Sequence, residues 1–128
     1  MVIDTSAIVA IALNEPEAAN FEEQIADDSI RLISAATVLE STIVLETRLG
    51  DAGGREFDLW LLKLGAEVVP VDAEQTDAAR RAWRLYGKGR HAAALNYGDC
   101  FSYALAKATG EPLLFKGSDF SLTDIQTV

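Results

Sequence analysis

The stretch Met1-Val2-Ile3-Asp4-Thr5-Ser6-Ala7 contains the unit from which the rest of the fold follows. Its first three residues are apolar, as in a short buried strand, and an acid comes where that strand ends. A helical pattern of apolar residues then runs from Thr5 to Leu13. A strand that passes directly into a helix is the first half of a β-α-β unit, so this stretch predicts an α/β protein.

The same order of a short apolar run and a longer helical pattern recurs along the chain. Strands are expected at Arg31–Ile33, Glu67–Val71 and Leu113–Phe115, with a possible last strand at Ile125–Val128. Helices are expected at Glu15–Asp28, Ala35–Leu49 and Phe57–Leu64, from Asp72 to about Gly87, and from Asn96 to Thr109. The glycine-rich segment Gly50–Gly54 is interpreted as a turn. Alternating strands and helices predict a mainly parallel sheet covered on both faces.

Charge and composition limit the class of protein. The 128 residues carry 11 Lys and Arg against 20 Asp and Glu, a formal net charge of −9, and one Cys. That length fits a single domain, residues 1–128, with an ordinary core. A lone Cys excludes a disulfide scaffold and favours a reducing, cytoplasmic location, and no apolar run reaches the roughly 20 residues of a membrane helix. With this net charge the chain is a poor candidate for general, charge-driven binding to nucleic acids.

Four acids lie at positions that an ordinary solvated surface does not explain. Asp4 and Asp119 follow strands, Glu40 lies in a largely apolar stripe of its helix, and Asp99 falls in the first turn of the last long helix. Each has a structural alternative. Asp4 can cap a helix and Asp99 can favour the helix dipole, whereas Glu40 can reach water from the margin of its stripe and Asp119 can serve in a turn.

What the four acids share is their place relative to the sheet. In right-handed β-α-β units, strand C-termini and helix N-termini meet at one edge, so all four are expected to converge there. Two carboxylates about 4 Å apart repel by about 4 kcal/mol at an effective dielectric of about 20. Mg²⁺ or Mn²⁺ offsets such repulsion and prefers oxygen ligands, whereas the chain has no His and Cys set for zinc. The acids therefore predict a metal site suited to phosphodiester hydrolysis by a metal-activated water.

Four stretches together resemble the PIN-domain nucleases, specifically the VapC-type toxins of prokaryotic toxin–antitoxin pairs. They are Val2–Ala7, Val38–Glu40, Leu95–Cys100 leading to Tyr103–Ala106, and Leu114–Phe120, of which the third is the most specific. The resemblance covers essentially the whole chain. It implies a three-layer α/β/α fold and an Mg²⁺- or Mn²⁺-dependent endoribonuclease that acts on RNA, forms a homodimer and is inhibited by a small VapB-type antitoxin.

The resemblance also assigns roles to the acids. Asp4, Glu40 and Asp99 match the first three acids of the family and are expected to hold the metal. Asp119 matches the C-terminal acid, which varies in the family and acts directly or through water. Asp124 is a nearby competitor for that fourth place.

Two hydroxyl residues directly follow the first acid. Thr5 and Ser6 are candidate substrate-binding residues that could instead orient Asp4 or a metal-bound water. No side chain stands out as a separate general base, so the nucleophile is assigned to metal-bound water. A non-catalytic alternative stays open, in which the acids hold an ion within a regulatory or interaction module. Haloacid-dehalogenase phosphatases also use a strand-end Asp, but they need a second Asp where this chain has Ser6.

Positive charge is concentrated in one short segment. Five of the 11 basic residues lie within eleven positions, namely Arg80, Arg81, Arg84, Lys88 and Arg90. Arg80, Arg84 and Lys88 recur every four residues, which places them on one helix face as candidate contacts for RNA phosphates. The alternatives are a solvated face paired with Glu74 and Asp77, or a contact with a twin subunit or the antitoxin.

Overall fold

The computed structural model describes all 128 residues and contains four short strands and six α-helices. In chain order they are β1 Val2–Ile3, α1 Thr5–Ala12, α2 Ala18–Asp27, β2 Leu32–Ser34, α3 Ala35–Leu49, α4 Asp51–Leu64, β3 Glu67–Val69, α5 Ala73–Tyr86, α6 Tyr97–Thr109 and β4 Leu113–Leu114, followed by a 3₁₀ turn at Phe120–Leu122. The strands form one sheet in the order β3-β2-β1-β4, and every neighbouring pair is parallel. The expected parallel sheet is therefore confirmed.

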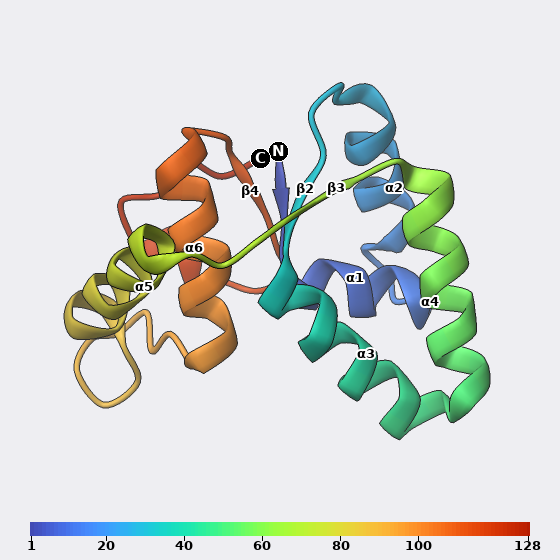
Figure 1. The fold of residues 1–128 in the computed structure, drawn as a ribbon, viewed down its shortest axis with the longest axis horizontal. Coiled ribbons are helices and arrows are strands. Elements are labelled where there is room, and N and C mark those ends of the chain that lie inside the picture. The colour runs from blue at the N-terminus through green and yellow to red at the C-terminus, as the bar shows by residue number, and fades with distance from the viewer.

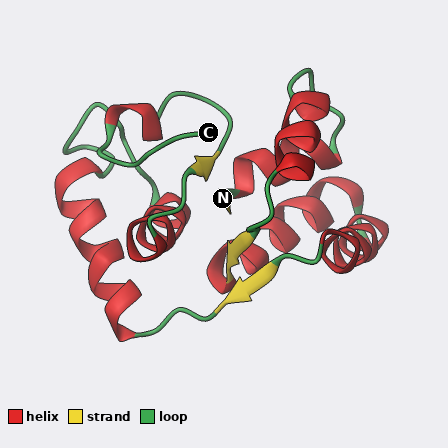
Figure 2. Ribbon diagram, turned by 90° about the horizontal axis from the view of Figure 1, so that it is seen from above, coloured by secondary structure: helices red, strands yellow, loops and turns green.

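Successive strand residues point to opposite faces of the sheet, and this alternation divides the core in two. Val2 and Leu113 pack with α5 and α6, whereas Ile3 and Leu114 pack with α1 to α4. Figure 1 shows the two groups of helices on either side of the strands, and Figure 2 shows the same arrangement from above. The fold is a three-layer α/β/α sandwich, as expected.

Side-chain caps fix the starts of α3, α5 and α6. Ser34, Asp72 and Asn96 each accept a hydrogen bond from a backbone N–H in the first turn of the helix that they precede. The cap of α6 is reciprocal, because the carboxylate of Asp99 accepts from the N–H of Asn96 at 2.7 Å. These caps satisfy donors that a helix leaves unpaired at its N-terminus, so the helix starts match the sequence pattern closely.

The turn predicted at Gly50–Gly54 is wrong, because α4 begins at Asp51 and continues through the other glycines. Only Gly50, with φ of 69°, interrupts the helical backbone. A Cβ on Gly53 would lie 2.9 Å from the carbonyl oxygen of Leu45 in α3. This glycine allows close packing of two helices, which sequence alone does not distinguish from flexibility.

The remaining differences concern the ends of elements. The first long helix expected from Glu15 begins at Ala18, and the possible strand at Ile125–Val128 is reduced to an isolated bridge between Leu113 and Thr127. β3 is an edge strand, as the neighbouring proline favours. None of the helices combines the length and apolar character that a membrane crossing requires.

Candidate functional site

The order of the strands creates a natural place for a site. The chain adds β2 and β3 on one side of β1 and then crosses over to lay β4 on the other side. The carboxyl ends of β1 and β4 therefore form a topological switch point, where open α/β sheets bind ligands. Asp4 comes directly after β1 and Lys116 shortly after β4, and both line a cavity of about 340 Å³.

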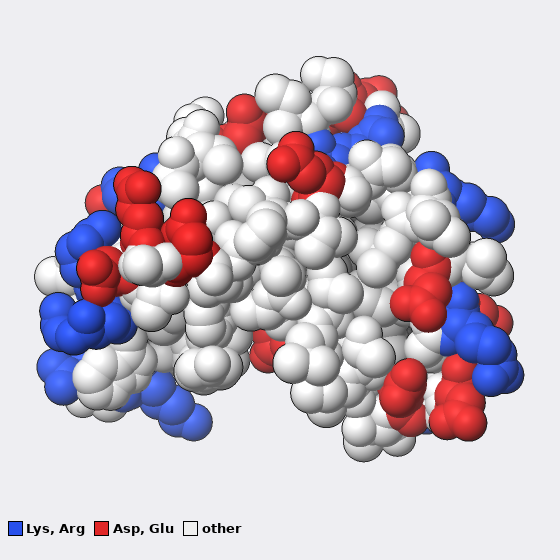
Figure 3. Space-filling view, in the orientation of Figure 1, with Lys and Arg blue, Asp and Glu red and all other residues white.

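This cavity, which we call the acid pocket, gathers side chains from distant parts of the sequence. Asp4 comes from the end of β1, Glu40 from the second turn of α3, and Asp99 from the first turn of α6. The full lining is Asp4, Thr5, Ser6, Val9, Glu15, Glu40, Val44, Arg48, Asn96, Asp99 and Lys116. In Figure 3 the surface is hollowed between the lobe of α5 and α6 and the lobe of α3 and α4, with acidic atoms visible in the notch.

Asp4 is almost fully buried and held by three hydrogen bonds. Its Oδ2 accepts from the backbone N–H of Ser6 at 2.8 Å and from the hydroxyl of Ser6 at 2.6 Å, while its Oδ1 accepts from the hydroxyl of Ser102 at 2.6 Å. The hydroxyl of Ser6 accepts in turn from the backbone N–H of Lys116 at 2.9 Å. These bonds fix the orientation of the Asp4 carboxylate between β1, β4 and α6.

Glu40 is half-buried and has a single hydrogen-bond donor. Thr5 donates from Oγ1 to Oε2 of Glu40 at 2.8 Å. Burial raises the pKa of Glu40, the hydrogen bond from Thr5 lowers it, and the charge of Asp4 raises it further. Thr5 and Ser6 are thus both engaged with acids of the pocket, which agrees with an orienting role for these hydroxyls rather than with free groups awaiting a substrate.

Asp99 has the most perturbed carboxylate of the pocket. Burial is the main cause that raises its pKa to about 6, opposed by the hydrogen bond from the backbone of Asn96. Repulsion from Asp4, Glu40 and Asp119 raises the pKa further. A carboxylate whose pKa is raised by burial and by like charges, inside a cavity, is typical of a functional site.

The three acids carry the oxygen ligands that a hard divalent cation prefers, but their side chains are not already arranged around a metal position. As they stand, no group of three or more His, Cys, Asp or Glu side chains is arranged to hold a metal ion. Each acid is instead turned toward its own hydroxyl or backbone donors, as expected of mutually repelling carboxylates. The one Lys of the pocket, Lys116, is paired with Glu15 at 2.6 Å and Glu17 at 3.1 Å. The acids are therefore not neutralised by a neighbouring basic side chain, and their oxygens match the ligand preference of Mg²⁺ and Mn²⁺.

The two candidates for a fourth acid lie in different surroundings. Asp119 is exposed and does not line the acid pocket, although its charge is close enough to raise the pKa of Asp99. Asp124 forms an ion pair with Lys107 at 2.7 Å and accepts from the hydroxyl of Tyr103 at 2.6 Å. These partners, the Lys107 ammonium first, lower the pKa of Asp124. The structure thus engages Asp124 elsewhere and leaves Asp119 as the candidate near the pocket.

The basic residues lie beside a different cavity. Arg80 and Arg84 line a groove of about 530 Å³ between α5 and α6, whereas Lys88 lies beyond the end of α5 at Tyr86. The expected single helix face for all three is therefore wrong. Figure 3 shows positive side chains gathered over α5 and the following loop. Arg80 pairs with Asp77 at 2.9 Å, but no carboxylate lies within ion-pair distance of Arg84 or Lys88.

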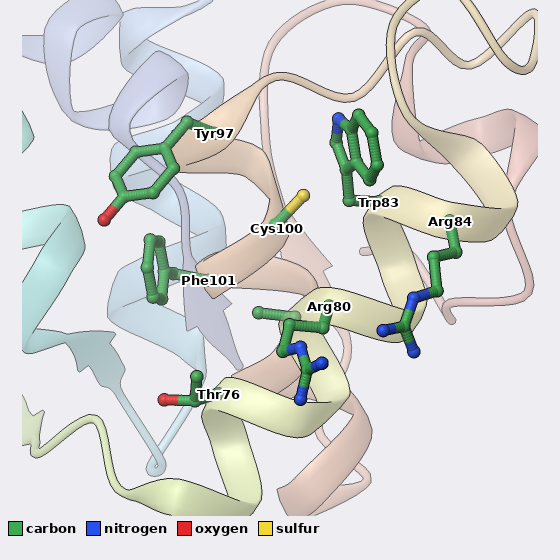
Figure 4. Close-up of a pocket in the computed structure, with 8 residues that line it drawn as sticks. Thr76, Arg80, Trp83, Arg84, Tyr97, Cys100 and Phe101 are labelled. Carbon is green, nitrogen blue, oxygen red and sulfur yellow. The ribbon is translucent and has the colours of Figure 1, made fainter.

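The groove itself, which we call the aromatic groove, is lined by Thr76, Ala79, Arg80, Trp83, Arg84, Tyr97, Cys100 and Phe101. Figure 4 shows the rings of Tyr97 and Phe101 side by side, with Cys100 between them and Trp83. The two rings meet edge to face with centroids 5.0 Å apart, and Tyr97 is 81% exposed. An aromatic side chain so exposed, in the helical turn that carries Asp99, points to a contact surface next to the acid pocket.

Comparison with known proteins agrees with this arrangement. The family model of the PIN domain matches residues 1–126. The chain belongs to the PIN domain family. A Ribonuclease VapC of Mycolicibacterium smegmatis is 61% identical over 128 residues, which cover 100% of this chain and 99% of that relative. Ribonuclease VapC30 of Mycobacterium tuberculosis is 60% identical over 128 residues, which cover 100% of this chain and 98% of that relative.

Two solved structures share the PIN fold at low sequence identity. The VapC20 toxin of Mycobacterium tuberculosis, described as cleaving the sarcin-ricin loop, has a TM-score of 0.80 at 19% identity and covers 99% of this chain and 97% of its own. VapBC2 from Rickettsia felis, solved with a DNA fragment from its promoter, has a TM-score of 0.74 at 17% identity, with coverages of 99% and 96%. The resemblance to the PIN domain inferred from sequence is confirmed.

Sequence reasoning missed Ser102, which holds an acid of this PIN-domain site. Ser102 lies in α6 three residues after Asp99 and is buried, and its hydroxyl contacts both Asp4 and, at 3.3 Å, the hydroxyl of Thr37. The sequence did contain a signal, because Ser102 interrupts a mostly apolar part of the helix. It also lies three residues after Asp99 and so on the same helix face as that acid. Most buried hydroxyls in proteins have a hydrogen-bond partner, and the acid one turn before Ser102 marks the direction in which to look for it.

Proposed function

We propose that this chain is an endoribonuclease toxin of the VapC type that hydrolyses RNA with Mg²⁺ or Mn²⁺ in the acid pocket and acts in the cytoplasm. The observation that carries the proposal is the convergence of Asp4, Glu40 and Asp99 in one cavity at the switch point of the sheet. The PIN family model and the relatives named Ribonuclease VapC support the same activity.

The three pocket acids would hold the ion, and Asp119 would join them directly or through water. When bound, such an ion lowers the pKa of a water molecule and offsets the negative charge on phosphate oxygens. The chain itself supplies orientation, because Ser6 and Ser102 hold the Asp4 carboxylate in one position. Arg48, which lines the acid pocket and has no carboxylate partner within ion-pair distance, is available to contact a phosphate.

The test of this function is cleavage of total cellular RNA followed by mapping of the new ends. The wild-type chain should cut RNA with Mg²⁺ or Mn²⁺ and stop when a chelator is added. Asp4→Asn and Asp99→Asn should remain folded, since both changes keep the size of the side chain, yet lose cleavage. Cleavage that persists in the presence of the chelator would contradict the proposed metal dependence.

A non-catalytic module that only holds an ion is the second candidate. It uses the same three acids, Asp4, Glu40 and Asp99, and like the nuclease it needs them to reorient around an ion, because no three ligands are arranged for one as they stand. The two candidates differ in one result. If Mn²⁺ raises the melting temperature through the pocket acids but end-mapping finds no cut RNA, the chain binds metal without being a nuclease.

We also propose that the chain pairs with a VapB-type antitoxin. The net charge of −9 and the acid pocket favour a basic segment of that partner, whose Arg would take the place of the cation. Such a segment should inhibit cleavage of RNA and should compete with Mn²⁺ for the pocket. Inhibition that is insensitive to the Mn²⁺ concentration would contradict insertion into the pocket.

A homodimer is proposed through the exposed apolar side chains of α3 together with Tyr97 at the start of α6. Leu39 and Ile43 are 62% and 57% exposed on α3, and Tyr97 lies exposed on the adjoining α6. Light scattering should find a dimer for the wild type and a monomer for Ile43→Asp with Tyr97→Asp. Leu62→Asp, which changes an exposed leucine of α4, should remain a dimer. A dimer that survives the double substitution would exclude this face.

A further inference from the structure

Gly98 lies in the first turn of α6, directly before Asp99, and its Cα faces Glu40. A Cβ built on Gly98 would overlap both carboxylate oxygens and the carboxyl carbon of Glu40. The φ angle of Gly98 is not in the left-handed region, so its backbone could be adopted by any residue. Glycine is also among the least favourable residues for a helix. Neither backbone conformation nor helix propensity therefore explains a glycine at position 98, whereas the need for space beside the Glu40 carboxylate does.

We propose that Gly98 is a positioning residue of the acid pocket. Its missing side chain lets the Glu40 carboxylate of α3 rest against the first turn of α6, next to the carboxylate of Asp99. The consequence for metal binding rests on the proposed function, whereas the contact between Gly98 and Glu40 does not. A glycine in this role brings two acids from separate helices to one place without adding a ligand of its own.

The geometry predicts that a Cβ at position 98 moves Glu40 rather than unfolding the chain. The overlapping atoms are the far end of a flexible side chain that is half-buried and held by one hydrogen bond from Thr5. A carboxylate so loosely held can rotate into the pocket opening. Gly98→Ala should therefore give a folded protein in which Glu40 has left its place beside Asp99.

Gly54 provides a matched control in the same protein. It also lies inside a helix, α4, and a Cβ there would likewise overlap a carboxylate, that of Glu46 in α3. Glu46 is exposed and does not line the acid pocket. Gly54→Ala therefore makes the same chemical change against the same kind of side chain, but away from the site.

The first experiment measures the contact in metal-free protein by a double-mutant cycle. Gly98→Ala is introduced into the wild type and into Glu40→Ala, and the unfolding equilibrium constant is measured in urea. In the Glu40→Ala background the alanine at position 98 has no carboxylate to displace. The change that Gly98→Ala causes in the unfolding equilibrium constant should therefore favour the folded state at least fivefold more in the Glu40→Ala background than in the wild type. Equal effects of Gly98→Ala in both backgrounds would overturn the contact and the proposal with it.

The second experiment measures the consequence by titrating Mn²⁺ into each folded protein and following the heat of binding. Gly98→Ala should bind Mn²⁺ at least tenfold more weakly than the wild type, and its RNA cleavage should fall mainly in kcat. Gly54→Ala should stay within about twofold of the wild type on both measures. Unchanged Mn²⁺ affinity in Gly98→Ala would overturn the positioning role alone. If the wild type binds no Mn²⁺ and cuts no RNA, the proposed function fails, and the positioning role fails with it.

Discussion

Ser102 donates a hydrogen bond of 2.6 Å to Oδ1 of Asp4, across 98 positions of the sequence. The bond joins the residue directly after β1 to α6, and both side chains are buried. Because Ser6 holds the other oxygen of Asp4, the carboxylate is bound on both sides and has little freedom to rotate. The position of this acid is thus set by the fold before any cation or substrate arrives.

Removal of the Ser102 hydroxyl should weaken both the fold and the site. Ser102→Ala leaves a buried, charged oxygen of Asp4 without its donor, which should lower the free energy of unfolding by about 1–3 kcal/mol. RNA cleavage should fall about tenfold or more, since Asp4 loses its fixed orientation. Urea denaturation and a cleavage assay with Mn²⁺ measure the two effects.

Ser41 is the matched control for this substitution. Its side chain is as buried as that of Ser102, but its hydroxyl has no hydrogen-bond partner. Ser41→Ala should therefore be neutral or slightly stabilising, because it removes an unsatisfied polar group. Equal losses of stability in the two variants would mean that the bond from Ser102 to Asp4 contributes nothing specific.

The pKa of Asp99 makes the metal-free protein less stable as the pH rises. Burial is the main cause that raises this pKa to about 6, from about 3.9 in an unfolded chain. Between these values the folded chain binds more protons than the unfolded chain, so the free energy of unfolding decreases as the pH rises through this window. After allowance for partial exposure, we expect a loss of about 1 kcal/mol between pH 4.5 and 7 in urea denaturation with a chelator present.

Asp99→Asn separates this effect from other titrations. Asn at position 99 has no carboxyl group that gains or loses a proton, so the free energy of unfolding of the variant should depend less on pH in the same window. The raised pKa of Glu40 also makes the free energy of unfolding decrease as the pH rises. A smaller dependence on pH should therefore remain in Asp99→Asn. The acids with lowered pKa, such as Asp28, act below about pH 4 and do not interfere. A slope unchanged by Asp99→Asn would assign the effect to other groups.

Gly53 should tolerate no side chain, although its segment has the composition of a loop. A Cβ at this position would lie 2.9 Å from the carbonyl oxygen of Leu45 and 2.7 Å from Cβ of Leu49, so α3 and α4 would have to separate. Gly53→Ala should lower the free energy of unfolding by about 1–3 kcal/mol, in spite of the better helix propensity of alanine. Thermal denaturation measures this loss, and an increase in melting temperature would show that the helices can move apart freely.

The choice between the two candidates for the fourth acid is open to a direct comparison. Asp119→Asn should weaken Mn²⁺ binding and RNA cleavage severalfold, because the charge of Asp119 is felt by Asp99. Asp124→Asn should leave cleavage nearly unchanged and lower stability by up to about 1 kcal/mol, since it breaks an exposed ion pair with Lys107. The opposite ranking of the two variants in a cleavage assay would exchange their roles.

The sequence was most informative where one local rule decides the structure. The caps at Ser34, Asp72 and Asn96 and the alternation of Val2 and Ile3 between two cores depend on neighbouring residues, and these features were predicted or follow directly from the strand pattern. The convergence of the pocket acids followed from topology, because parallel β-α-β units bring strand ends and helix starts together.

Features that depend on close contact between distant segments were not visible in the sequence. Gly53 was interpreted as part of a turn because only the position of α3 reveals its packing role. Ser102 was passed over because its partner, Asp4, lies 98 positions away. The spacing of four residues places Lys88 on the face of Arg84 only if the helix continues to it, whereas the expected end near Gly87 and the observed end of α5 at Tyr86 both leave Lys88 outside the helix.

The basic segment from Arg80 to Arg90 offers this acidic chain a way to approach RNA. Arg84 and Lys88 have no carboxylate partner, and Arg90 stacks on Trp83 with its guanidinium carbon 4.0 Å from the ring centroid. Each phosphate that such residues contact on a single strand should contribute about 0.7 to the slope of log affinity against log salt. The double variant Arg84→Ala with Lys88→Ala should therefore weaken RNA binding at low salt and flatten its salt dependence.

A matched pair of basic residues on the opposite lobe tests whether location or net charge is responsible. Arg55 and Lys63 are exposed on α4, and neither has an ion-pair partner. The double variant Arg55→Ala with Lys63→Ala also removes two positive charges. It should leave the slope of log affinity against log salt close to that of the wild type. RNA binding is measured by fluorescence anisotropy from 50 to 200 mM salt, with a chelator to prevent cleavage. If both double variants flatten the slope equally, RNA responds to the total charge of the chain, and the segment after Trp83 has no particular role in binding.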